Sequence, residues 1–176
     1  NDANQITYGL TSRYINLDSG AEVLTASLGQ TYKFEDSRVT LAGTPVREET
    51  WSDLQLDVTY QPITSLKING TLIRNQQSRE IDQRNVRLQY RTDSKHILNI
   101  NYRFQRDILE TSEISGAWQV HPQWVLLARK HQDLRQNREL ESVYGVQYDS
   151  CCWGLRFVKR RYYSDAYPDK PYQDAL

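Results

Sequence analysis

The adjacent cysteines, Cys151 and Cys152, are the residues whose type and spacing most directly suggest chemistry. A disulfide between sequence neighbours would strain the peptide bond that joins them. In an oxidising compartment, two free thiols would be a liability. Two interpretations follow: each cysteine forms a disulfide with a cysteine outside this chain, or both are reduced structural residues. At this point both interpretations are open.

The remaining reactive side chains form no recognisable catalytic or metal-binding motif. The three histidines, His96, His121 and His131, lack the spacing of zinc ligands and have no cysteine near them in sequence. The glycines form no phosphate-binding loop, and there is no Gly-x-Ser-x-Gly nucleophile motif. A barrel hydrolase whose Ser, His and Asp converge only in three dimensions stays open as an alternative. We predict a non-catalytic protein with no metal and no other cofactor.

Length and charge restrict the classes of protein to consider. The 176 residues suffice for one ordinary domain. Lys plus Arg and Asp plus Glu both number 22, so the formal net charge is zero, which argues against a nucleic-acid-binding protein. No stretch approaches the roughly 18 apolar residues of a transmembrane helix. Two classes remain: a soluble all-β domain, or part of a membrane β-barrel, whose strands give a weak hydropathy signal.

Apolar and polar residues alternate with a period of two, most clearly over 54–60, 86–91 and 98–105. Such alternation puts apolar side chains on one face of a strand and polar side chains on the other. We count about ten strands, several near ten residues long, which is the length that a tilted strand needs to cross a bilayer. We predict one continuous strand over 66–72, although its Asn69-Gly70 pair is also a strong hairpin signal.

The connections between these segments are of two kinds. Short connections, most with turn residues, lie at 18–20, 61–64, 93–95, 121–123 and 149–151. Longer polar connections lie at 35–51, 76–83 and 132–139, while the one at 106–109 is short. Short turns at one rim and longer loops at the other are typical of up-and-down outer-membrane barrels. A soluble sandwich would more often mix hairpins with crossover connections.

The residue types on the two faces also favour a barrel. Arg, Asn and Gln suit a wet barrel lumen, where Arg pairs with carboxylates and carbonyls, although an ordinary solvated sheet face is nearly as consistent with them. The aromatic residues on the apolar faces, many near strand ends, favour the barrel because aromatic girdles mark both interfaces of such proteins. The Arg residues that alternate with apolar residues are Arg13, Arg87, Arg91, Arg103, Arg129 and Arg156.

The segment Tyr144–Trp153, with the sequence YGVQYDSCCW, resembles the adjacent cysteine pair and its surroundings in the LptD family. These are the lipopolysaccharide-assembly proteins of Gram-negative outer membranes. Residues 8–13 and 28–34 look like two strands of the same barrel, and 89–91 and 99–103 fit its later strands more loosely. The resemblance runs in order from about residue 6 to about residue 160, and the cysteine segment is its most specific part.

The resemblance implies a very large barrel that follows a periplasmic β-jellyroll domain and holds a plug lipoprotein, LptE. Lipopolysaccharide would arrive along a periplasmic protein bridge and leave sideways through a seam between the first and last strands. Cys151 and Cys152 would form disulfides with cysteines near the N-terminus of the full-length protein. The rim of short turns, which carries both cysteines, would then be the periplasmic one.

On this resemblance, residues 1–176 are the C-terminal part of an outer-membrane barrel domain, a single partial domain without the jellyroll, the early strands or the partner cysteines. We expect an all-β, antiparallel, up-and-down sheet that serves lipopolysaccharide transport and ends before the strand that closes the seam. Its two open edges should make it unstable alone. The alternatives are a porin-like outer-membrane channel and a soluble β-sandwich binding module.

Overall fold

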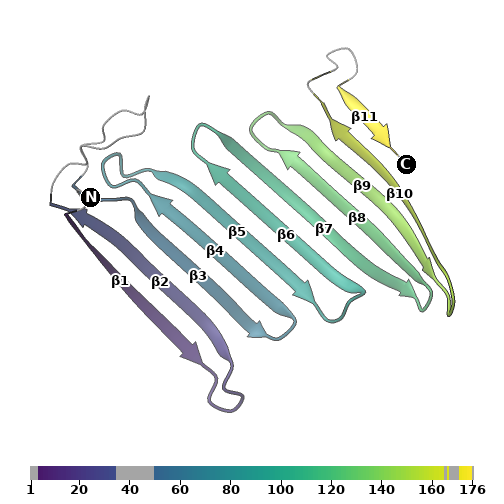
Figure 1. The fold of residues 1–176 in the computed structure, drawn as a ribbon, viewed down its shortest axis with the longest axis horizontal. Helices are drawn as coiled ribbons and strands as arrows, with labels where there is room; N and C mark the ends of the chain where they lie inside the picture. The colour runs from purple at the N-terminus through teal and green to yellow at the C-terminus, as the bar shows by residue number, and fades with distance from the viewer. Residues whose placement is uncertain (1–3, 35–49, 165, 167–170, 176) are drawn as a thin grey trace.

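The alternating segments form eleven strands in a single antiparallel sheet. The computed structural model describes residues 4–34, 50–164, 166 and 171–175. Each strand pairs with its neighbours in sequence, so the order across the sheet is β1 to β11 (Figure 1). The strands are β1 (Gln5–Ile15), β2 (Glu22–Lys33), β3 (Leu54–Ile63), β4 (Leu66–Arg74), β5 (Ile81–Arg91), β6 (His96–Gln105), β7 (Leu109–His121), β8 (Trp124–Asp133), β9 (Arg138–Asp149), β10 (Gly154–Tyr163) and β11 (Tyr172–Ala175).

This architecture confirms the predicted all-β, up-and-down class. The strands β1 to β10 have 9 to 13 residues each, which is the length that a tilted membrane strand needs. β4 continues through Asn69 and Gly70, as predicted, because both residues pair with β3 and β5 along an uninterrupted ladder. The eleventh strand, β11, has four residues and pairs with the end of β10. Among the described residues, β1 and β11 are unpaired edges.

The predicted contrast between short and long connections is only partly correct. The polar stretches 76–83 and 132–139 were predicted as longer loops, but β5 already begins at Ile81, and only 134–137 separate β8 from β9. Side chains at the strand ends make these connections tight turns. The carboxamide oxygen of Asn75 accepts hydrogen bonds from the backbone amides of Gln77 and Ser78. Asp133 does the same for the amides of Arg135 and Gln136. Most of the predicted loop at 35–51 lies outside the described residues.

In the described ranges the sheet is one layer thick, with no second sheet or helix packed on either face (Figure 1). Val125 is the one apolar side chain in the described part of the chain that is buried, with 4% of its surface exposed. A soluble β-sandwich places the apolar faces of two sheets against each other to form a dry core. The described residues therefore do not form the soluble β-sandwich that was one of the alternatives.

Candidate functional site

The apolar face of the sheet is uncovered and continuous. The side chains of Leu10 and Phe157 are 71% and 63% exposed, and those of Ile6 and Leu155 are about half exposed. The cross-strand register places these residues on one face, because each pairs with an apolar residue of the adjacent strand. An exposed apolar surface of this extent marks a membrane or protein interface rather than a solvated surface.

The apolar band lies at an angle to the rows of residues that pair across the strands. Two such rows show this. The first is apolar on β1 to β4, at Leu10, Leu28, Leu56 and Leu72, and then meets the charged residues Arg84 on β5 and Glu110 on β7, with Phe104 between them. The second begins at the polar His96 on β6 and is apolar on β7 to β10, at Trp118, Leu126, Val146 and Phe157. An oblique band is what strands tilted in a bilayer require, because the membrane plane then cuts across the rows.

Aromatic rings cluster at the two ends of this face. At the rim of the β9–β10 connection, the ring of Tyr148 lies 4.9 Å from that of Trp124 and 5.0 Å from that of Trp153, centroid to centroid. At the opposite rim, the ring of Tyr32 lies 4.8 Å from that of Trp51. The predicted concentration of aromatic residues toward both strand ends is confirmed, and it matches the interfacial girdles of membrane barrels.

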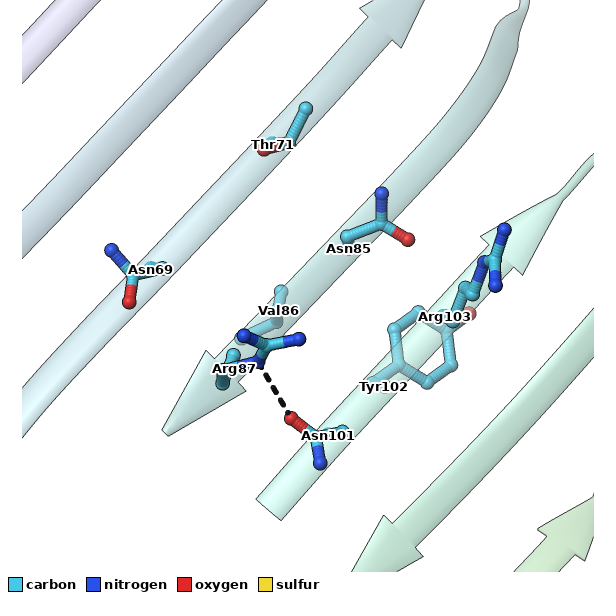
Figure 2. A pocket seen from close by; sticks show the side chains of 8 residues that line it. All are labelled: Asn69, Thr71, Asn85, Val86, Arg87, Asn101, Tyr102 and Arg103. Atoms are coloured by element: carbon cyan, nitrogen blue, oxygen red, sulfur yellow. Dashed lines mark hydrogen bonds between the residues drawn. The ribbon is translucent and has the colours of Figure 1, made fainter. Parts of the chain in front are cut away.

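The opposite face is polar and carries all six of the arginines that alternate with apolar residues. A hollow of about 430 Å³ in this face is lined by residues of β4, β5 and β6. Figure 2 shows their side chains. The guanidinium of Arg87 donates a hydrogen bond to the side-chain oxygen of Asn101, 3.1 Å away. Asn69 and Asn85 lie beside them, and Arg103 follows on β6. These groups can hydrogen-bond to water, sugars or anionic groups.

A chain of ion pairs crosses the polar face further along the sheet. Arg129 on β8 donates to Glu113 on β7 at 2.7 Å and to Glu141 on β9 at 2.9 Å. The second carboxylate oxygen of Glu141 accepts from Arg160 on β10 at 2.5 Å. Glu141 is 12% exposed, so its charge depends on these two arginines more than on water. Four adjacent strands are thereby linked by charged hydrogen bonds.

The alternation did not predict an apolar patch on the polar face. Ile97, Ala117, Leu127 and Val143 line a hollow of about 400 Å³ there, next to Arg129. The register confirms that they share a face, because Ile97 pairs with Ala117 and Ala117 with Leu127. The available signal was the run of adjacent apolar residues over 125–128, which cannot all point the same way in a strand.

The two cysteines lie together at one rim, in the connection between β9 and β10. Their sulfur atoms are 2.9 Å apart, and both residues are exposed. The hydrogen bond with Cys151, and to a lesser degree burial, raises the pKa of the Cys152 thiol above its ordinary value. Ser150 closes the turn, since its amide donates to the carbonyl of Trp153 at 2.9 Å. These are the two cysteines of the sequence, so a disulfide with any other cysteine needs a partner outside these 176 residues.

Neither a metal centre nor a long apolar helix is present in the residues that the structure describes. No three His, Cys, Asp or Glu side chains in the described ranges gather where they could hold a metal ion. The same ranges contain no helix of the length and apolar character needed to span a membrane.

The chain is similar to lipopolysaccharide-assembly proteins. The profile of the LptD family, described as LPS transport system D, matches residues 1–124. The LPS-assembly protein LptD of Nitrosococcus oceani is 37% identical over 170 residues, which cover 97% of this chain and 23% of the relative. That of Aromatoleum aromaticum is 34% identical over 161 residues, covering 92% and 20%. That of Xylella fastidiosa strain 9a5c is 34% identical over 172 residues, covering 94% and 22%.

The extent of these matches confirms the resemblance that the sequence suggested. The chain spans between 20% and 23% of the length of these three relatives, whose alignments cover nearly all of it. The profile match takes in β1 to β7. Since the family profile covers more than half of the 176 residues, this chain belongs to the LptD family.

Proposed function

We propose that residues 1–176 form the C-terminal part of an outer-membrane barrel that inserts lipopolysaccharide into the outer leaflet. The observation that carries this proposal is the single-layer sheet with one continuous apolar face and one polar face. The apolar face meets lipid, and the polar face lines an aqueous lumen. The role is transport and membrane assembly, without catalysis, and the relatives named as LPS-assembly proteins support it.

The polar face contacts a plug protein of the LptE type. A uniformly wet lumen would need no apolar side chains, but Ile97, Leu127 and Val143 form an apolar hollow beside the charged Arg129. An apolar area surrounded by polar groups is the usual anatomy of a protein interface. The N-terminal domain of the full-length protein contacts the periplasmic bridge protein that delivers lipopolysaccharide. On the polar face of the barrel, the hollow around Arg87 can form hydrogen bonds with the saccharide part of lipopolysaccharide.

The cysteine turn connects the barrel to the periplasmic domain. Cys151 and Cys152 are exposed at a rim outside the apolar band, where cysteines of another domain can reach them. Each forms a disulfide with such a cysteine, and their rim is the periplasmic one. In non-reducing electrophoresis of the full-length protein, replacing both cysteines with Ser should remove a mobility shift that a reductant also removes. An unchanged band would contradict this role.

Depletion of the full-length protein tests the transport function. In depleted cells, newly made lipopolysaccharide should fail to reach the cell surface, and re-expression of the wild-type gene should restore it. The measurement is labelling of surface lipopolysaccharide after a pulse. A porin-like channel predicts the opposite pattern: normal surface lipopolysaccharide, with reduced entry of small solutes.

A further inference from the structure

We propose that the lipid-facing side of β6 to β10 carries a binding site for one lipopolysaccharide molecule of the outer leaflet. An acyl chain lies in an apolar groove over β6 to β9, and a phosphate of the lipid headgroup lies between Lys130 and Lys159. This inference rests on the proposed function, which turns this face toward lipid.

The groove is a consequence of residue size along one cross-strand row. Leu98, Gly116, Ala128 and Tyr144 are paired in register across β6, β7, β8 and β9. The two small residues in the centre form the floor, and the larger side chains form the walls. The hollow has a volume of about 390 Å³, which falls within the ~300–1,000 Å³ typical of ligand sites. Its walls also include Ile114, Trp118 and Leu126.

Close backbone packing between β6 and β7 keeps a side chain out of the floor of the groove at Gly116. A Cβ atom on Gly116 would lie 2.7 Å from the carbonyl oxygen of Ile97 on the neighbouring strand. That contact is with the backbone, so a side chain at this position would require the paired strands to separate. The groove is therefore built into the β6–β7 pairing, and neither Gly116 nor Ala128 has a side chain large enough to fill it.

Cations stand at one end of the groove. Lys130 lines the hollow and follows Ala128 by two residues, so it lies on the same face. Lys159 pairs with Tyr144, the wall of the groove. Among the described residues, neither lysine is in an ion pair. Two carboxylates lie nearby. Glu139 accepts a hydrogen bond from Ser142 at 2.7 Å, and Asp174 lies beside Arg161 in the cross-strand register.

Charge complementarity identifies the occupant. Unpaired lysines beside an apolar, lipid-facing groove are costly unless an anion accompanies them. A phosphorylated lipid satisfies both halves of the site, because its acyl chain matches the groove and its phosphate matches the ammonium groups. Lys130 lies toward the end of β8 that is remote from the cysteine turn. With that turn on the periplasmic side, the lysines face the outer leaflet, where the phosphorylated lipid is lipopolysaccharide.

The test uses full-length protein with its plug partner in phosphatidylcholine nanodiscs, and native mass spectrometry measures the bound lipopolysaccharide. The variants are K130Q/K159Q, which removes the cations, and A128W, which fills the groove. Each should lower lipopolysaccharide affinity about tenfold, as expected for losing charged hydrogen bonds or the acyl-chain site.

Matched controls are K33Q/K67Q on the polar face and A26W on the apolar face of β2, and both should bind like wild type. Dephosphorylated lipopolysaccharide should bind wild-type protein about as weakly as K130Q/K159Q does, which tests the site without any substitution.

Two results would overturn the proposal. Equal affinity of wild type and K130Q/K159Q would show that the lysines bind no phosphate. Equal competition by phosphatidylglycerol would show that the site takes any anionic lipid rather than lipopolysaccharide. Both results can occur while depletion still blocks surface delivery of lipopolysaccharide, so they are distinguishable from a failure of the proposed function.

Discussion

Glu141 shows how single side chains stabilise the polar face. Its carboxylate accepts from Arg129 and Arg160, which come from the strands on either side. A carboxylate with little contact with water and two arginine partners is worth more than a surface ion pair, because its bonds are poorly screened. By contrast, Arg13 Nε and a carboxylate oxygen of Glu22 are 3.8 Å apart, and these side chains are 64% and 48% exposed.

Replacing Glu141 with Gln should lower the free energy of unfolding by about 1–2 kcal/mol, because two charged hydrogen bonds become weaker ones. The control is E22Q, which should change it by less than about 0.5 kcal/mol. Urea unfolding of the full-length barrel in detergent measures both. Equal effects of the two variants would show that the network contributes no more than an exposed pair.

Two strand glycines, Gly70 on β4 and Gly116 on β7, should respond in opposite ways to alanine. At Gly116 the new methyl group meets the Ile97 carbonyl oxygen, whereas at Gly70 no atom lies within 4 Å of it. G116A should therefore destabilise the protein by about 1–3 kcal/mol through overpacking. G70A should be neutral or stabilise it by up to about 1 kcal/mol, because glycine is costly within a strand. Heat-modifiable gel mobility of the full-length barrel gives both midpoints, and a G116A midpoint equal to that of G70A would contradict the close approach.

At the scale of a strand, β6 shows how alternating residues give the sheet an apolar face and a polar face. Leu98 and Ile100 lie on the apolar face, while Asn99 and Asn101 lie on the polar face. A shift of register by one residue would exchange these faces, so the hydrophobic pattern determines the pairing of the strand.

The two faces of β6 predict different tolerance for charge. I100R places a cation in the middle of the apolar band and should cost about 2–4 kcal/mol of folding free energy in lipid. The neighbouring substitution N99R adds the same side chain to the polar face and should have little effect. Folding of the full-length protein into lipid vesicles, followed by urea titration, measures both. A larger loss for N99R would reverse the assignment of the faces.

At the scale of the whole molecule, the decisive feature is that the residues described by the structure form a single layer. Both edge strands of the described sheet, β1 and β11, have unpaired backbone groups on one side. Such edges are costly in lipid and promote association in water. None of the described residues covers the apolar face, so we expect a bilayer to cover it and further strands to pair with the two edges.

Residues 1–176 expressed alone should therefore aggregate in aqueous buffer and disperse only in detergent. Size-exclusion chromatography with light scattering tests this expectation, with the full-length barrel in the same detergent as the reference. A monodisperse monomer without detergent would contradict a membrane sheet and favour a soluble domain.

Local pattern by itself determined the strands, their two faces and the family. Continuous alternation predicted β4 through Gly70 and placed Arg87 and Arg103 on the polar side, because side-chain direction in a strand depends only on the position along it. The cysteine segment indicated the family because it is one contiguous stretch of sequence, which can be compared without knowing the fold. Only the tertiary structure decided which side chains meet: Arg129 with Glu141, Gly116 with Ala128, and the inward patch around Leu127. Those meetings depend on register between strands and on bulges and capped turns, which relate residues that are distant in sequence.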